Sequence, residues 1–184
     1  MIIFWIILAL MGIAILWAAA SYNNLVQLRE RVKNGWSQID VQLKRRHDLI
    51  PNLVETAKGY LAHEKDTLEK VIRARQQAVD ASGLKDKQEA ENFLSGTLRS
   101  LFAVSENYPN LKADRQMMQL QEELTSTENK ISFARQYYND EVNRLNAIVQ
   151  SFPVNIIAGM FNFSKENFFE SEDPAERQVP NVKF

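Results

Sequence analysis

The sequence predicts an all-α protein in which an N-terminal transmembrane helix continues into an antiparallel, up-and-down four-helix bundle. An uncharged apolar run opens the chain, and four later stretches repeat apolar residues every three or four positions, which is the helical period. Glycine and proline are scarce, at 6 and 5 of 184 residues. So few turn residues do not suit a sheet-rich domain, and short connections between amphipathic helices favour a bundle.

The N-terminal run predicts a membrane anchor over residues 1–21. Residues 2–20 carry no charged, hydroxyl or amide side chain, and as a helix they rise about 28 Å, close to the hydrocarbon thickness of a bilayer. Trp5 and Trp17 lie near the two ends, and Tyr22 follows, as in an aromatic belt. A cleaved signal peptide has a cationic start and a shorter apolar stretch, so we expect an uncleaved single-pass anchor.

Basic residues after the anchor indicate its orientation. Arg29, Arg31 and Lys33 come first, and the cluster at residues 44–46 follows. Positive-inside logic places this side of the cell (inner) membrane in the cytoplasm, although the nine-residue gap before Arg29 leaves an outward-facing domain open. The first three are candidates for contact with lipid headgroups, or they determine topology alone. The cluster at 44–46 lies roughly 38 Å from the span and is interpreted as a solvated or salt-bridged face.

Residues 22–150 form the predicted helical domain. Its first helix runs from the anchor to about Ile50, and a second is expected from near Pro51 to the turn signal at Ser82-Gly83. However, residues 47–51 contain no glycine and make a poor loop. The alternative fold is therefore a long helical hairpin, kinked at Pro51, with its tip at residues 80–86.

The third helix is expected from about Asp86 to Asn107, where Tyr108-Pro109-Asn110 interrupts the pattern. The fourth has the cleanest pattern, because its apolar residues step alternately by three and four from Met117 to Ile148. That is a heptad seam, typical of a coiled coil or of one wall of a bundle core. We favour the bundle wall, because three other amphipathic helices need a partner.

In either architecture the last helix returns toward the membrane, so residues 151–170 should lie near the bilayer surface. Five of the ten phenylalanines fall in this segment. Its apolar side chains either dip into the headgroup region or pack against the base of the bundle. The candidate membrane-proximal residues are Phe152, Ile156, Ile157, Met160, Phe161, Phe163, Phe168 and Phe169. Residues 171–184 are expected to be an extended or partly disordered tail.

Few residues point to chemistry. There is no cysteine, and neither His47 nor His63 has the spacing of a metal-binding helix, so we expect no catalytic, cofactor or metal site and no enzymatic activity. A net charge of −1 argues against nucleic-acid binding. Polar residues beside the heptad seam predict a buried network that fixes the bundle register, with a solvated face as the alternative. Its candidates are Asp40, Glu128, Asn129, Arg135 and Tyr138.

The chain resembles the LemA family of bacterial membrane proteins over almost its whole length. The most specific part is the run WSQIDVQLKRRHDLIPNLV at residues 36–54, and LQEELTSTENKISFARQYYN at residues 120–139 is similar too. Leu145 departs from the tyrosine that the family usually has before Asn146, which affects local packing only. The resemblance implies one N-terminal anchor, an antiparallel four-helix bundle and no catalytic function. Some family members are associated with internal membranes such as magnetosomes, and others occur beside membrane stress proteases.

These features predict a membrane-anchored, non-catalytic scaffold that self-associates and organises or remodels the bilayer. The expected partners are the lipid bilayer and further copies of the chain. The alternative is an adaptor or regulator of a membrane protease or of a signalling or stress-response partner, which would make a membrane protein its partner.

Overall fold

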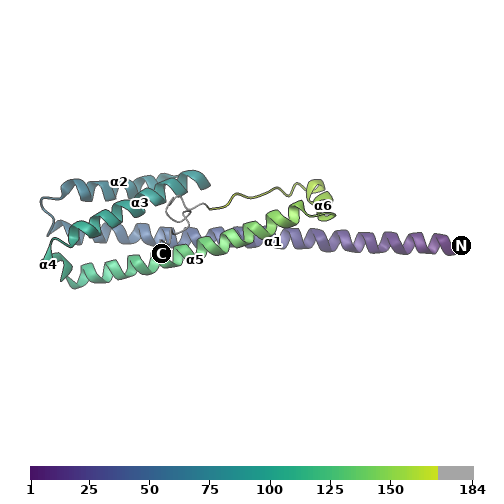
Figure 1. Cartoon of the computed structure of the whole chain (residues 1–184), viewed down its shortest axis with the longest axis horizontal. Coiled ribbons are helices and arrows are strands. Elements are labelled where there is room, and N and C mark those ends of the chain that lie inside the picture. The colour runs from purple at the N-terminus through teal and green to yellow at the C-terminus, as the bar shows by residue number, and fades with distance from the viewer. Residues whose placement is uncertain (170–184) are drawn as a thin grey trace, which may run out of the picture. The chain divides into compact units, whose positions relative to one another are not determined.

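The computed structural model describes residues 1–169, and every secondary-structure element in them is an α-helix (Figure 1). No strand occurs within these residues, which confirms the all-α prediction. The predicted tail at residues 171–184 lies outside the described residues. The helices are α1 (Ile2–Lys58), α2 (Lys65–Asp80), α3 (Leu84–Ser105), α4 (Pro109–Lys112), α5 (Arg115–Gln150) and α6 (Val154–Met160).

The chain divides into two compact units, and the long helices α1 and α5 contribute to both. One unit, here called the anchor unit, comprises residues 1–39 and 133–168. The other, called the body unit, comprises residues 40–132 together with Phe169 among the described residues.

Helix α1 does not break at Pro51, which corrects the predicted start of a second helix there. A proline inside a helix leaves the carbonyl four residues earlier without its N–H donor. In this protein that carbonyl belongs to His47, and the Nε of Arg75 on α2 donates a hydrogen bond to it at 2.7 Å. The lost bond is replaced by a side chain from another helix, so α1 continues to Lys58.

The chain leaves the helix at residues 59–64 and turns into α2. The alternative fold, a kinked hairpin whose first arm would continue to about residue 80, is therefore wrong. The expected turn at Ser82-Gly83 is present, and Gly83 adopts a φ of 87°, in the region that favours glycine. Helix α5 ends at Gln150, where the prediction placed its end.

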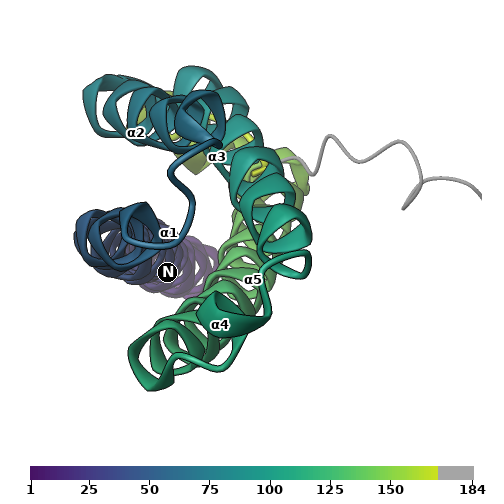
Figure 2. The same ribbon diagram turned by 90° about the vertical axis from the view of Figure 1, so that its left-hand side faces the viewer.

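The body unit is held together by one apolar core. Figure 2 shows α2 beside α3, and buried side chains from α1, α2, α3 and α5 meet in one cluster. Among its members are Ile50, Leu53, Leu68, Val71, Leu94, Leu101, Met117 and Leu120. Each helix supplies residues three or four apart, so the stripes seen in the sequence form this core.

In the anchor unit, α1 and α5 pack closely and run antiparallel. Trp36 on α1 meets Tyr138 on α5, with ring centroids 5.9 Å apart, while Tyr22 meets Phe161 beyond the end of α5. Gly35 allows the close approach, because a Cβ there would lie 3.1 Å from the Cα of Tyr138. A larger residue at this position would push the backbone of Tyr138 away by a few tenths of an ångström.

Candidate membrane-proximal site and buried charge cluster

The first five turns of α1 expose almost all of their apolar side chains. Within the described residues, α1 is the one helix that is long and apolar enough to cross a membrane, by length and composition. Exposed side chains in this stretch include Ile2, Ile3, Phe4, Trp5, Leu10, Met11, Ile13, Ile15 and Leu16. A continuous apolar surface of this kind is stable in lipid and unfavourable in water.

Three aromatic rings gather just after the apolar run, and we call them the aromatic cluster. The ring of Tyr22 lies 4.7 Å from that of Phe161 and 5.9 Å from that of Phe163, measured between centroids. Asn162 takes a positive φ of 56° between the two phenylalanines, a conformation that asparagine tolerates better than most residues. The chain after α5 is thereby held against the α1 turn that follows residue 20.

Helix α6 has one buried face and one exposed apolar face. Ile157 and Ala158 are buried, whereas Phe152, Ile156 and Met160 are exposed, with Met160 at 70%. Ile156 and Met160 are four apart on α6 and therefore lie on one side of it, and Phe152 is exposed in the turn that precedes the helix. We call them, with the partly exposed Phe161, the apolar edge.

The eight predicted membrane-proximal residues thus separate into two groups. Ile157, Phe163 and Phe169 are buried by protein, while the remaining five are exposed. The exposed five are Phe152, Ile156, Met160, Phe161 and Phe168. Only the exposed group has side chains available to lipid.

The extended segment after the aromatic cluster is fastened to α5 by side chains. The Nδ2 of Asn146 donates to the carbonyl of Glu166 at 2.9 Å, and the N–H of Glu166 donates to the Oδ1 of Asn146 at 2.8 Å. The hydroxyl of Tyr138 donates to the carbonyl of Asn167 at 2.9 Å. Burial, and secondarily the charge of Glu166, raise the pKa of the Tyr138 phenol. The phenol therefore stays a donor, and side chains of α5 hold the extended segment in place.

The three predicted headgroup residues lie in different surroundings. The guanidinium carbon of Arg29 lies 4.9 Å from the centroid of the Phe163 ring, a cation–π geometry, and its Nε is buried without a hydrogen-bond partner. Lys33 forms an exposed ion pair with Glu30 at 2.9 Å. Arg31 is exposed. Arg29 is therefore the one of the three that the aromatic cluster holds in place.

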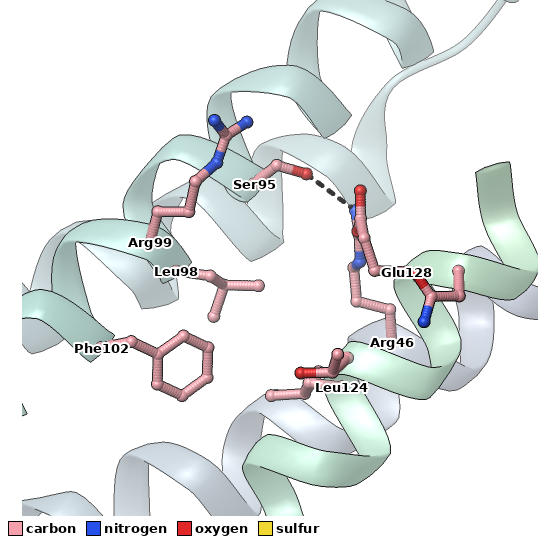
Figure 3. Close-up of a pocket in the computed structure, with 9 residues that line it drawn as sticks. Arg46, Ser95, Leu98, Arg99, Phe102, Leu124 and Glu128 are labelled. Atoms are coloured by element: carbon pink, nitrogen blue, oxygen red, sulfur yellow. Dashed lines mark hydrogen bonds and ion pairs between the residues drawn. The ribbon is translucent and has the colours of Figure 1, made fainter.

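The body unit contains a buried charge cluster centred on Arg46, which is 1% exposed (Figure 3). Its Nη1 donates to Glu91 at 3.2 Å and to the Oγ of Ser95 at 3.1 Å, and its Nη2 pairs with Glu128. The Nε2 of His47 lies 2.6 Å from the other carboxylate oxygen of Glu91. The arginine is thus compensated by two carboxylates from two helices.

The salt bridges predicted as one alternative for residues 44–46 are present at Arg45 and Arg46, but Arg46 is buried and does not belong to an exposed face. Lys44 and Arg45 are exposed, and Arg45 lies 3.7 Å from Glu123, but Arg46 points into the core. The sequence does indicate the burial of Arg46, because Arg46 and His47 fall between Leu43 and Ile50 on the apolar face of α1.

The five residues predicted to form one polar network have separate partners or surroundings. Asp40 pairs with Lys87 at 2.7 Å, and Glu128 pairs with Arg46. Asn129 is exposed on α5, Tyr138 binds the extended segment, and Arg135 is partly buried in the anchor unit. A polar network does exist around the buried Arg46, with His47, Glu91 and Ser95 as partners and the half-exposed Glu128 at its edge.

A groove lies beside this cluster, between α3 and α5. Its volume is about 320 Å³, and its apolar walls are Leu98, Phe102 and Leu124. Figure 3 shows these three side chains around an open space, with Arg46 and Glu128 at one side. In the described part of the chain, no group of three or more His, Cys, Asp or Glu side chains is placed to hold a metal ion.

Similarity to known proteins covers most of the chain. Protein LemA of Metamycoplasma hominis is 24% identical over 155 residues, which span 82% of this chain and 69% of that protein. Magnetosome proteins MamQ 1 and MamQ 2 of Paramagnetospirillum magneticum are each 24% identical over 180 residues, covering 84% of this chain and 66% of each relative. The chain therefore spans about two thirds of the length of these relatives. The LemA family model matches residues 35–184, and the chain belongs to the LemA family.

Proposed function

We propose that this chain is a non-catalytic membrane scaffold, anchored in the cell (inner) membrane with its body in the cytoplasm, which self-associates and organises or remodels the bilayer. Its partners in this role are lipid and further copies of itself. The observation that carries the proposal is the apolar edge, exposed on a segment whose aromatic cluster is stacked on Tyr22.

The level of Tyr22 relative to the bilayer supports contact between the apolar edge and lipid. Tyr22 follows the last residue of the apolar run by two positions, or about 3 Å of helix. A side chain stacked on it lies in the headgroup region when residues 2–20 cross the hydrocarbon. Apolar side chains at this depth bury themselves at the boundary between headgroups and acyl chains, in one leaflet. A wedge confined to one leaflet favours curvature.

The cations near the anchor support contact between this end of the chain and anionic lipid headgroups. Arg29 lies about seven residues, or roughly 10 Å of helix, beyond Tyr22, and its side chain leans back toward the helix start. Each Lys or Arg near an anionic surface adds about 1 kcal/mol of attraction. Two relatives are named as magnetosome proteins, which also supports a role at a membrane.

Deformation of liposomes by the full-length protein tests this function. The triple variant F152S/I156S/M160S removes most of the apolar edge and should strongly reduce tubulation of anionic liposomes. A matched control, I72S/V79S/M118S, replaces three exposed apolar residues of the body unit and should deform liposomes like the unaltered protein.

Unchanged deformation by the first triple variant would contradict the role of the apolar edge. A strict monomer at high protein concentration in lipid would contradict the scaffold itself. Stoichiometric co-purification with one unrelated membrane protein, without self-association, would favour an adaptor role instead.

A further inference from the structure

We propose that Arg29, held on the ring of Phe163, is a binding site for the phosphate group of one anionic phospholipid in the adjacent leaflet. The inference rests on the proposed function, because it names the lipid chemistry that the membrane-proximal end of the scaffold selects. Both residues belong to the anchor unit. The ligand is a headgroup phosphate whose negative charge is not offset by an amine in the same headgroup.

The guanidinium of Arg29 is held in one place by an aromatic ring. Its carbon lies 4.9 Å from the centroid of the Phe163 ring, and Phe163 itself is buried. The planar guanidinium stacks on an aromatic face and is less strongly hydrated than the ammonium of a lysine. A side chain that is already immobilised loses less entropy when it binds an anion, so this arginine is prepared for a ligand.

The same guanidinium keeps donors for an anion. Its Nε is buried without a hydrogen-bond partner, so the two terminal nitrogens are the ones that can reach a ligand. Within residues 1–169 Arg29 is paired with no carboxylate, whereas Lys33 is paired with Glu30. Two parallel N–H groups of an arginine match two oxygens of a phosphate, which is the bidentate arrangement between these groups.

The height of the guanidinium matches the headgroup layer. The ring of Phe163 lies 5.9 Å from the ring of Tyr22, measured between centroids, and Tyr22 follows the apolar run by two residues. Two short contacts therefore connect the guanidinium to the end of the span. Each headgroup layer is about 5–7 Å thick, and a helical side chain leans toward the helix start. With residues 2–20 in the hydrocarbon, the guanidinium of Arg29 meets the lipid phosphates.

Arg31 provides a comparison on the same helix. It has the same charge as Arg29, is exposed, and lies two residues or about 3 Å farther from the span. Within the described chain no aromatic ring stacks on it. A general attraction between cations and an anionic surface would treat the two arginines nearly alike. A site built by Phe163 requires Arg29.

Native mass spectrometry tests the site on the full-length protein in detergent. The protein is titrated with phosphatidylglycerol or with phosphatidylcholine, and the spectra give the dissociation constant of the first bound lipid. The unaltered protein should prefer phosphatidylglycerol in both about 0.2 M and about 1 M ammonium acetate, because the Debye length at the higher concentration is only about 3 Å and a direct contact persists.

Three variants separate a direct contact from general attraction. R29Q should raise the dissociation constant for phosphatidylglycerol at least about fivefold at both salt concentrations, and R31Q should change it less than about twofold at the higher one. R29K keeps the charge without the planar fork, so it should resemble R29Q at high salt. Equal effects of R29Q and R31Q at both concentrations would overturn the site.

Two further outcomes identify the ligand and protect the conclusion about function. Excess inorganic phosphate should not displace phosphatidylglycerol, because a free anion lacks acyl chains that lie against the anchor, and displacement would contradict a lipid site. If R29Q binds phosphatidylglycerol normally while the unaltered protein deforms liposomes, the site is wrong and the scaffold stands. If the unaltered protein binds neither lipid and leaves liposomes unchanged, the proposed function itself fails.

Discussion

The anchor unit and the body unit use apolar side chains in opposite ways. The anchor unit presents them on its surface, along the first turns of α1 and on the apolar edge, whereas the body unit collects them in one buried core. Water favours burial of apolar side chains in a core, whereas a lipid bilayer tolerates them on the surface of a helix. The two units therefore suit different surroundings. A continuous run of exposed apolar residues therefore marks the start of α1, whereas the exposed apolar residues of the body unit, such as Ile72, Val79 and Met118, are scattered around a buried core.

Two arginines of α1 show the same contrast for charge. Arg29 lies over the ring of Phe163 and, within the described chain, pairs with no carboxylate, whereas Arg46 is enclosed by Glu91 and Glu128. A cation left open near a membrane can attract anionic headgroups. A cation buried in a core must be neutralised by partners, and such partners restrict how the helices can pack.

The largest effect is expected from Arg46→Ala in the body unit. Removing the arginine leaves Glu91 buried with its charge poorly compensated, which should lower the free energy of unfolding by about 3–5 kcal/mol. Urea unfolding of the full-length protein in detergent, followed by circular dichroism, measures this change.

Arg45→Ala is the matched control, because Arg45 is exposed and its pairing with Glu123 is long. Its loss should cost less than about 1 kcal/mol. Equal effects of the two substitutions would show that Arg46 is not buried as the structure places it.

The next effect concerns the close approach of α1 and α5 in the anchor unit. Gly35→Ala places a Cβ 3.1 Å from the Cα of Tyr138, so the helices must shift, and we expect a loss of about 1–3 kcal/mol. Gly96→Ala is the control, since its Cβ would meet nothing within 4 Å, and it should stabilise α3 by up to about 1 kcal/mol. Thermal melts should shift in opposite directions, and a shared direction would contradict the tight contact.

A smaller and local effect is expected at the extended segment. Asn146→Ala removes both hydrogen bonds to Glu166, each worth about 1 kcal/mol. Amide hydrogen exchange of residues 164–168 should then accelerate on the order of tenfold, while exchange in the body unit stays unchanged. Unaltered exchange at Glu166 would mean that Asn146 does not hold the segment.

The smallest effect is a dependence on pH at the start of α5. The backbone N–H of Met117 and the hydroxyl of Tyr60 donate to Asp114 and lower the pKa of its carboxyl below the ordinary 3.8. A lowered pKa stabilises the fold above pH 3.8, and this contribution is lost as the pH falls through the lowered value. Asp114→Asn keeps a helix cap but cannot ionise. Its melting temperature should therefore approach that of the unaltered protein as the pH drops from 6 to 3, and a constant difference would contradict this role.

The sequence predicted the features that depend on local pattern. The apolar run, the end of α5 and the turn at Gly83 each follow from neighbouring residues. The passage of α1 through Pro51 could not be predicted this way, because the freed carbonyl of His47 is satisfied by Arg75, 28 positions away. Local pattern alone would have ended the helix.

For the candidate site too, the sequence predicted what depends on local pattern and missed what depends on distant contacts. Clustered aromatic residues indicated the segment that packs against Tyr22, but which of them face outward depends on that packing. The burial of Arg46 depends on Glu91 and Glu128, which come from two other helices. Charged residues read one at a time are expected on the surface, so this cluster emerged only when the helices were packed together.

Imaging the full-length protein in lipid tests the central claim most directly. Electron cryo-microscopy of anionic liposomes carrying the protein should show regular side-by-side arrays on curved membrane, with α6 at the headgroup level. Single molecules scattered on membrane whose curvature equals that of protein-free liposomes would contradict the scaffold.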